Sequence, residues 1–126
     1  MPTFNDIPQI QPCEQLVEQR QHWFSAYQNK DIGTMSSIET SEFFVVHYQN
    51  VEKKADWHNN VQNVTEPNDV LLTIHNPNKI RHDCLGDSSC IITSYFKQPT
   101  QTILVKEMWT NQHGHWQINS LAIAKI

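Results

Sequence analysis

The second half of the chain consists of strand-like segments joined by very short connections, and this feature limits the fold more than any other. Segments 90–96, 102–110 and 115–124 are rich in β-branched and aromatic residues, and only five and four residues separate them. Strands connected in this way pair antiparallel, because a parallel pair needs a crossover of about a dozen residues. The sequence therefore predicts an antiparallel meander.

Two more strand regions are expected upstream of the meander. Residues 42–49 (EFFVVHYQ) are β-branched and aromatic. Segments 70–75 and 79–84 flank Asn76-Pro77-Asn78, and we interpret them as one long strand with a bend at the proline. A turn over residues 85–88 then leads into the meander.

Helical patterns come first along the chain. Apolar residues recur over 13–29 at the 3.6-residue period of one helix face; they are Leu16, Val17, Trp23, Phe24 and Tyr27. Asp31 is typical of an N-cap and starts a second short helix over 32–38. Trp57, Val61 and Val64 indicate a third helix from residue 54 to residue 64.

Helices that precede an antiparallel sheet indicate an α+β fold. We expect one domain over 13–126, preceded by an extended arm over 1–12 that contains three prolines. The chain of 126 residues is 38% hydrophobic, which allows one core. Its net charge of −4 argues against nucleic-acid binding.

Cellular location is predicted from the N-terminus and the cysteines. The first residues show neither a basic nor an apolar leader region, and no apolar run is long enough to span a membrane. An odd cysteine count without a leader favours reduced thiols and a cytoplasmic protein. Cys84 and Cys90 could nevertheless face each other across a hairpin and form a bridge.

The last hairpin predicts which side chains point inward. A four-residue loop over 111–114 would set Trp109 opposite Trp116, and alternation would place Val105, Glu107, Ile118 and Ser120 on the same face. A turn centred on Pro99 would add three residues of the preceding strand, and a one-residue error there would reverse them; they are Ile91, Thr93 and Tyr95. The opposite face is half apolar, which suits a homodimer through the outer sheet face.

Several segments resemble the SnoaL-like proteins of the nuclear transport factor 2-like (NTF2-like) superfamily. The matching segments occur in the family's order; they are Trp23-Phe24-Ser25-Ala26-Tyr27 with Asp31, Lys54-Ala55-Asp56-Trp57, Gly86 to Thr93, Met108-Trp109, and Gly114 to Ile118. The resemblance implies a curved antiparallel (mixed) sheet wrapped around the N-terminal helices, which forms a cone with a pocket and is usually found as a homodimer. The final strand departs from the family, because residues 119–124 replace its frequent polar or histidine ending.

Glu107 is the candidate catalytic residue, because it lies two positions before Trp109 and shares its face. A carboxyl group in an aromatic cavity can serve as a general acid or base. The competing interpretation is an ion pair with Arg20 or Arg81.

Aromatic residues are the candidate walls of an apolar pocket, although aromatics at these spacings also form ordinary cores. The candidates are Trp23, Tyr27, Trp57, Tyr95, Trp109 and Trp116. Tyr27 and Tyr95 could also donate a hydroxyl to a ligand. The seven histidines show no metal-binding spacing, and we expect no metal and no cofactor.

Three functions remain open at this point. The first is binding of a small apolar molecule in the cone, and the second is a cofactor-free isomerase, dehydratase or hydrolase that uses Glu107. The third is an interaction or dimerisation module with a collapsed pocket. Whether the protein is an enzyme is left undecided.

Overall fold

The structure is a computed structural model that describes residues 13–64 and 69–126, so the predicted arm over 1–12 lies outside the described residues. The elements follow the order α1 (Glu14–Gln28), α2 (Ile32–Ile38), β1 (Glu39–His47), β2 (Asn50–Lys53), α3 (Lys54–Asn63), α4 (Asp69–Leu72), β3 (Lys79–Leu85), β4 (Ser89–Lys97), β5 (Thr102–Gln112) and β6 (His115–Lys125).

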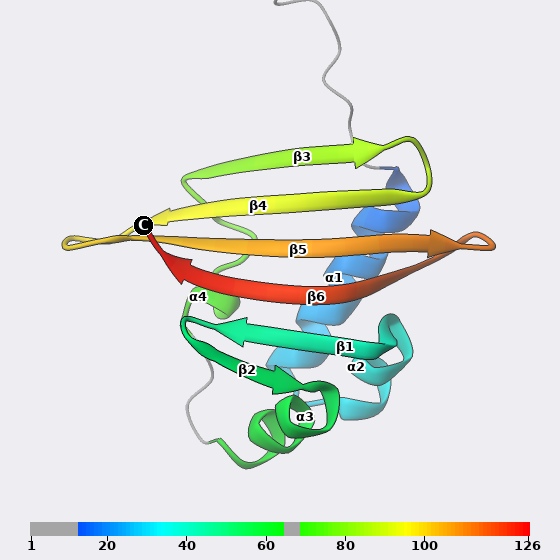
Figure 1. The fold of residues 1–126 in the computed structure, drawn as a ribbon, viewed down its shortest axis with the longest axis horizontal. Coiled ribbons are helices and arrows are strands. Elements are labelled where there is room, and N and C mark those ends of the chain that lie inside the picture. The colour runs from blue at the N-terminus through cyan, green and yellow to red at the C-terminus, as the bar shows by residue number, and fades with distance from the viewer. Residues whose placement is uncertain (1–12, 65–68) are drawn as a thin grey trace, which may run out of the picture.

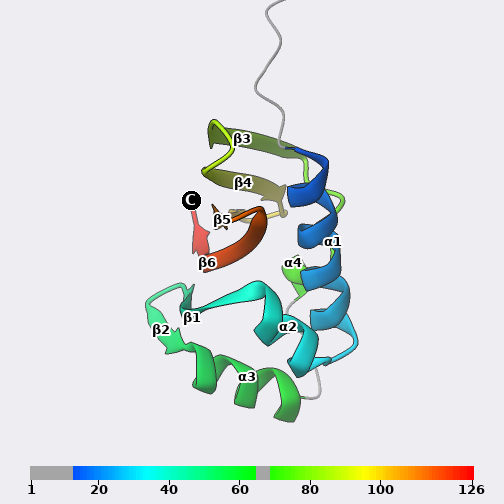
Figure 2. The same cartoon turned by 90° about the vertical axis from the view of Figure 1, so that its right-hand side faces the viewer.

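The strands form one open sheet in the order β2-β1-β6-β5-β4-β3. Neighbouring strands run antiparallel except for β1 and β6, which are parallel because the chain crosses from one side of the sheet to the other between them. Helices α1, α2 and α4 lie on one face, and α3 lies beyond β1 and β2 at the end of the sheet (Figures 1 and 2). The predicted α+β class with a mixed sheet is confirmed.

The first three helices form where the apolar spacing predicts them. Asp31 caps α2 by accepting a hydrogen bond from the backbone N–H of Thr34 at 3.2 Å. On α1 the buried stripe includes Leu16, Trp23 and Tyr27, whereas Val17 is exposed. The inward side of α1 therefore faces the sheet with its aromatic rings.

The predicted strand over 70–75 is wrong, and no bent strand runs through Asn76-Pro77-Asn78. Residues Asp69–Leu72 form the short helix α4, and Val70, Leu71 and Ile74 are buried in the core. Their i, i+1 and i+4 spacing fits a helical turn, and a short apolar run does not distinguish helix from strand by itself. Strand β2 was not predicted, and β1 begins at Glu39, three residues earlier than expected.

The β5–β6 hairpin turns more tightly than predicted. Its loop is His113-Gly114, with φ of 56° and 81°, as a two-residue type I′ turn requires. Trp109 therefore pairs with Ile118, and Asn111 pairs with Trp116. The shift of two residues preserves the face, so Trp109 and Trp116 are both buried on the inner side, as expected.

A bulge in β6 changes the later assignments. Trp109 pairs with Ile118 but Met108 pairs with Ser120, so Asn119 is the extra residue. Beyond it Leu121 points inward opposite Glu107, and Ser120 lies on the outer side with Met108. The expectation that Ser120 faces inward was wrong for this reason.

The side chains of β4 point to the opposite faces from those predicted. Lys97 pairs with Thr102, so the connection holds four residues and is not centred on Pro99. Ile91, Thr93 and Tyr95 consequently face outward, and Cys90, Ile92, Ser94 and Phe96 face inward with Glu107 and Trp109. Tyr95 is thereby separated from the other candidate pocket residues by the sheet.

Cysteines 84 and 90 lie directly opposite each other on β3 and β4 and form a disulfide. Cys13 is the free cysteine. The expectation of three reduced thiols is therefore wrong for two of them, and the cross-hairpin bridge left open above is the observed state. The bridge ties the edge strand β3 to the rest of the sheet.

Candidate functional site

Glu107 is wholly buried on the inner face of β5 and forms an ion pair with Arg20 of α1. Arg20 Nε donates to Oε1 at 2.8 Å, and Arg20 Nη2 donates to Oε2 at 2.8 Å. Trp109 Nε1 donates to Oε1 at 3.0 Å. Both oxygens of the candidate catalytic carboxylate are thus occupied by fixed donors, in the bidentate geometry that neutralises its charge.

A second buried carboxylate, Glu39 at the start of β1, was not predicted. It is 2% exposed, and its Oε2 accepts a hydrogen bond from Trp23 Nε1 at 2.8 Å. His58 Nε2 of α3 lies 2.5 Å from its Oε1. Burial raises the pKa of the Glu39 carboxyl group, against the smaller lowering effects of the Trp23 and His58 hydrogen bonds.

Three aromatic rings on α1 and α3 stand parallel in a row. Trp23 stacks on Tyr27 with ring centroids 6.2 Å apart, and Tyr27 stacks on Trp57 at 5.8 Å and an interplanar angle of 4°. Trp23, on α1, lies at one end of this row in the core. Trp57, on α3, lies at the other end. The row connects the core to a cavity.

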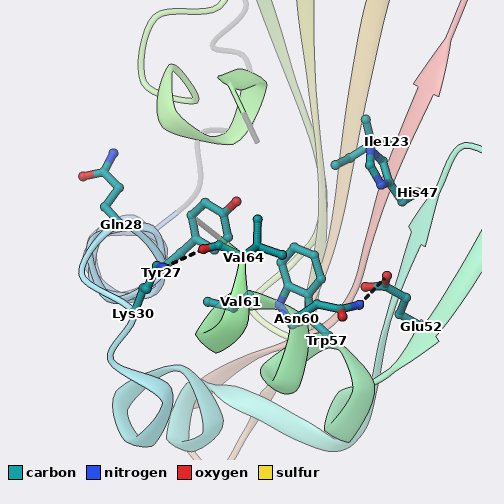
Figure 3. Close-up of a pocket in the computed structure, with 10 residues that line it drawn as sticks. All are labelled: Tyr27, Gln28, Lys30, His47, Glu52, Trp57, Asn60, Val61, Val64 and Ile123. Atoms are coloured by element: carbon teal, nitrogen blue, oxygen red, sulfur yellow. Dashed lines mark hydrogen bonds between the residues drawn. The ribbon is translucent and has the colours of Figure 1, made fainter. Parts of the chain in front are cut away.

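That cavity has a volume of about 410 Å³ and lies between the end of α1, the β1–β2 hairpin, α3 and the end of β6. Figure 3 shows the side chains that line it: Tyr27, Gln28, Lys30, His47, Glu52, Trp57, Asn60, Val61, Val64 and Ile123. Tyr27 and Trp57 provide its aromatic wall, and Ile123 faces them from the sheet.

Of the six predicted pocket aromatics, Tyr27 and Trp57 line this cavity. Trp23 and Trp109 are buried in the core, and Tyr95 is on the outer face. Trp116 borders a smaller hollow of about 260 Å³ between α1 and the β5–β6 hairpin. The sequence predicted that all six line one pocket. Strand alternation indicates which face of the sheet a side chain is on, but it does not indicate how far along the sheet the side chain lies.

Polar groups at the cavity were missed by the sequence analysis. Asn60 Nδ2 donates to Glu52 Oε1 at 2.8 Å, and Lys30 Nζ donates to the carbonyl oxygen of Val64 at 2.6 Å. Glu52 belongs to β2, which was not predicted, and Lys30 lies in the connection from α1 to α2. The inward direction of Glu52 follows from its pairing with the buried Val45.

Two histidines lie near the Arg20–Glu107 ion pair. Burial lowers the pKa of His75 and of His82, and the positive charge of Arg20 lowers both further. Within residues 13–64 and 69–126, no three His, Cys, Asp or Glu side chains come together as a metal site would require. None of the helices in these two ranges is long and apolar enough to cross a membrane.

Comparison with known proteins gives the fold a name. No protein-family model matches the chain, and no curated protein matches its sequence. Solved structures do match. A protein of unknown function from Pectobacterium atrosepticum has a TM-score of 0.67 at 9% identity, with 98% of each chain covered.

Two other solved structures cover nearly as much. The CaMKII hub of S. rosetta has a TM-score of 0.65 at 12% identity, over 94% of this chain and 100% of the hub. An NTF2-like protein from Cytophaga hutchinsonii has a TM-score of 0.62 at 10% identity, over 87% and 94% of the two chains. The chain has the NTF2-like fold, as its resemblance to SnoaL-like proteins implied.

Proposed function

We propose that the protein binds a small, largely apolar molecule in the cavity between α1, α3 and the sheet. The observation that carries this proposal is the aromatic wall of that cavity, where the parallel rings of Tyr27 and Trp57 border about 410 Å³ of space. Ligand sites in proteins are typically concave, of about 300–1,000 Å³, and apolar with a few polar groups. The cavity has this size and this composition.

Binding is a better proposal than acid–base catalysis by Glu107. The carboxylate of Glu107 is held by Arg20 and Trp109, and Glu107 is absent from the residues that line the cavity. A general base needs a free oxygen within reach of the substrate. An interaction module with a collapsed pocket is disfavoured by the volume of the cavity itself.

Cavity filling tests this proposal. Val64 lines the cavity and is exposed, so Val64→Trp places an indole in the space without disturbing the core. We expect flat apolar acids, steroids and polyketide-like compounds to raise the Tm of the native protein in a concentration-dependent way. Val64→Trp should abolish that rise.

The matched control is Val17→Trp, an equally exposed valine on α1 that does not line the cavity. This variant should respond to ligand as the native protein does. The proposal is overturned if no compound raises the Tm, or if Val64→Trp and Val17→Trp respond equally.

We also propose that a second copy of the chain covers the outer face of the sheet. No helix of the described ranges lies on this face (Figure 2), and its residues include Phe44, Leu104, Met108 and Ala122. Met108, on the central strand β5, is 43% exposed. Exposed apolar patches of this kind mark interaction surfaces.

Sedimentation velocity tests the dimer. Met108→Lys puts a charge on the outer face and should convert a dimer to a monomer. Val17→Lys, at an exposed position on α1 and therefore on the other side of the sheet, is the control and should leave the dimer intact. A monomeric native protein, or a Met108→Lys variant that is still dimeric, rules out this interface.

A cytoplasmic location is kept as part of the proposal, and the cysteines provide its test. Disulfides are rare in a reducing cytoplasm. The structure bridges Cys84 and Cys90, so a cytoplasmic location requires that rapid alkylation of cell extracts, followed by mass spectrometry, find these two cysteines as thiols in the cell and bridged only after purification in air. Recovery of the bridged form directly from cells would contradict a cytoplasmic location.

A further inference from the structure

Glu52 places an unpaired negative charge in the cavity wall. It is half-buried on β2, and its hydrogen-bond partner among the described residues is the neutral amide of Asn60, which donates to Oε1 at 2.8 Å. The ion pairs within residues 13–64 and 69–126 are Arg20–Glu107, His58–Glu39 and Arg81–Asp83, so no described cation pairs with Glu52. A carboxylate partly removed from water attracts a cation more strongly than an exposed one does.

The positive charge of Lys30, the lysine that lines the cavity, is stabilised by a backbone carbonyl group and not by Glu52. Its ammonium group donates to the carbonyl oxygen of Val64 at 2.6 Å. This carbonyl lies just past the C-terminus of α3, where the helix dipole is negative. Figure 3 shows Lys30 and Glu52 on opposite sides of Trp57, so the two charges mark different ends of the cavity.

The aromatic wall lies between these two ends. Tyr27 stacks between Trp23 and Trp57, so Trp57, the last ring of the row, is the one that offers a flat π face to the cavity. Such a face favours contact with a planar ring, and the face of an indole also attracts a cation. A cationic group would avoid the Lys30 end and gain attraction at the Glu52 end.

We propose that the cavity selects a protonated aromatic amine, with its ring against Trp57 and its ammonium group at Glu52. This inference rests on the proposed binding function and adds the chemical class and the orientation of the ligand. Asn60 positions the Glu52 carboxylate through Oε1 and leaves Oε2 for the ligand's N–H. His47, next to Glu52 on the inner face of β1, borders the same end of the cavity.

Matched probes of one shape and different charge test the selection. Indole, indole-3-acetate and tryptamine share a ring, and so do naphthalene, 1-naphthylacetate and 1-naphthylmethylamine. Titration calorimetry and NMR should show each amine binding about tenfold more tightly than the acid on the same ring, a difference typical of one charge–charge contact. Added salt should reduce that difference.

Glu52→Gln keeps an oxygen that accepts from Asn60 and removes the charge. We expect it to weaken amine binding about tenfold and to leave binding of the neutral rings unchanged. Glu42→Gln, which removes an exposed carboxylate of β1 outside the cavity, should change neither.

The outcomes separate this inference from the proposed function. Equal affinity for amines and acids, or an amine affinity that Glu52→Gln does not change, overturns the inference while cavity binding stands. Amine binding that survives Val64→Trp shows that the amine binds elsewhere, and it also overturns the inference. If no amine binds at millimolar concentration, the inference fails, and the Tm screen with Val64→Trp decides the proposed function separately.

Discussion

Two buried carboxylates of this protein, Glu107 and Glu39, each accept a hydrogen bond from a tryptophan, but they differ in the basic side chain that pairs with them. Glu107 and Glu39 are both fully enclosed, and each accepts a hydrogen bond from a tryptophan indole, at 3.0 Å and 2.8 Å respectively. Glu107 is paired with an arginine, which is always charged, and Glu39 with a histidine, which is charged only when protonated.

This difference separates a structural charge from an adjustable one. Arg20 holds Glu107 through two short hydrogen bonds that link α1 to the middle of the sheet. His58 links β1 to α3, the helix that supplies Trp57 and Asn60 to the cavity. A change in the protonation of Glu39 would therefore act on a wall of the proposed ligand site.

Removal of Arg20 should have the largest effect. Arg20→Met keeps much of the side-chain length but leaves Glu107 buried without its cation, which typically costs about 3–5 kcal/mol. Urea denaturation measures the loss. Arg81→Met is the control, because the exposed Arg81–Asp83 pair should contribute less than about 1 kcal/mol.

A double variant sharpens this result. Arg20→Met combined with Glu107→Leu removes both charges, and it should recover much of the stability, since buried pairs are often replaceable by apolar residues. If Arg20→Met alone costs less than about 1 kcal/mol, Glu107 does not depend on its ion pair and the contrast with Glu39 disappears.

Removal of His58 should have a smaller effect. His58→Leu leaves Glu39 with the Trp23 donor, and Glu39 can take up a proton because burial already raises its pKa. The expected loss is about 1.5–3 kcal/mol, that of one hydrogen bond to a charged group. His22→Leu, at an exposed position on α1, should change stability little. A loss as large as that of Arg20→Met would mean that Glu39 cannot adjust in this way.

The sequence predicted well the features that depend on local period and order. Leu16, Trp23 and Tyr27 identified α1, Asp31 marked the start of α2, and the short connections identified the meander. The resemblance to SnoaL-like proteins led to the observed fold. The common burial of Trp109 and Trp116 survived a wrong loop length because a shift of two residues preserves the face.

The errors arose where a single residue decides the outcome. The extra residue at Asn119 places Leu121 on the inner face, where Ser120 was expected. The four-residue turn after Lys97 places Tyr95 on the outer face. The polar residues of the cavity could not be predicted from local patterns, because Glu52, Asn60 and Lys30 come together only through the packing of β2 and α3. Glu39 was overlooked because nothing in its neighbours along the chain shows that Trp23 and His58 reach it.

The pH dependence should be the smallest effect, with opposite signs at two sites. Glu39 has a folded-state pKa above its ordinary 4.5, chiefly through burial. Its contribution to stability is therefore full below that ordinary value and is lost as pH rises through the raised folded value. His82 has a folded-state pKa below its ordinary 6.5, through burial and Arg20. Its contribution is present above 6.5 and is lost as pH falls.

Two variants separate these contributions when unfolding is measured in urea between about pH 4 and pH 8. Relative to the native protein, Glu39→Gln should gain stability as pH rises, because the variant carries no carboxyl group that ionises while buried. His82→Gln should gain relative stability as pH falls, because no imidazole resists protonation beside Arg20. Glu42→Gln, an exposed control, should follow the native curve. Parallel curves for Glu39→Gln and the native protein would show that Glu39 does not change its protonation state within this range, and the contrast drawn with Glu107 would then fail.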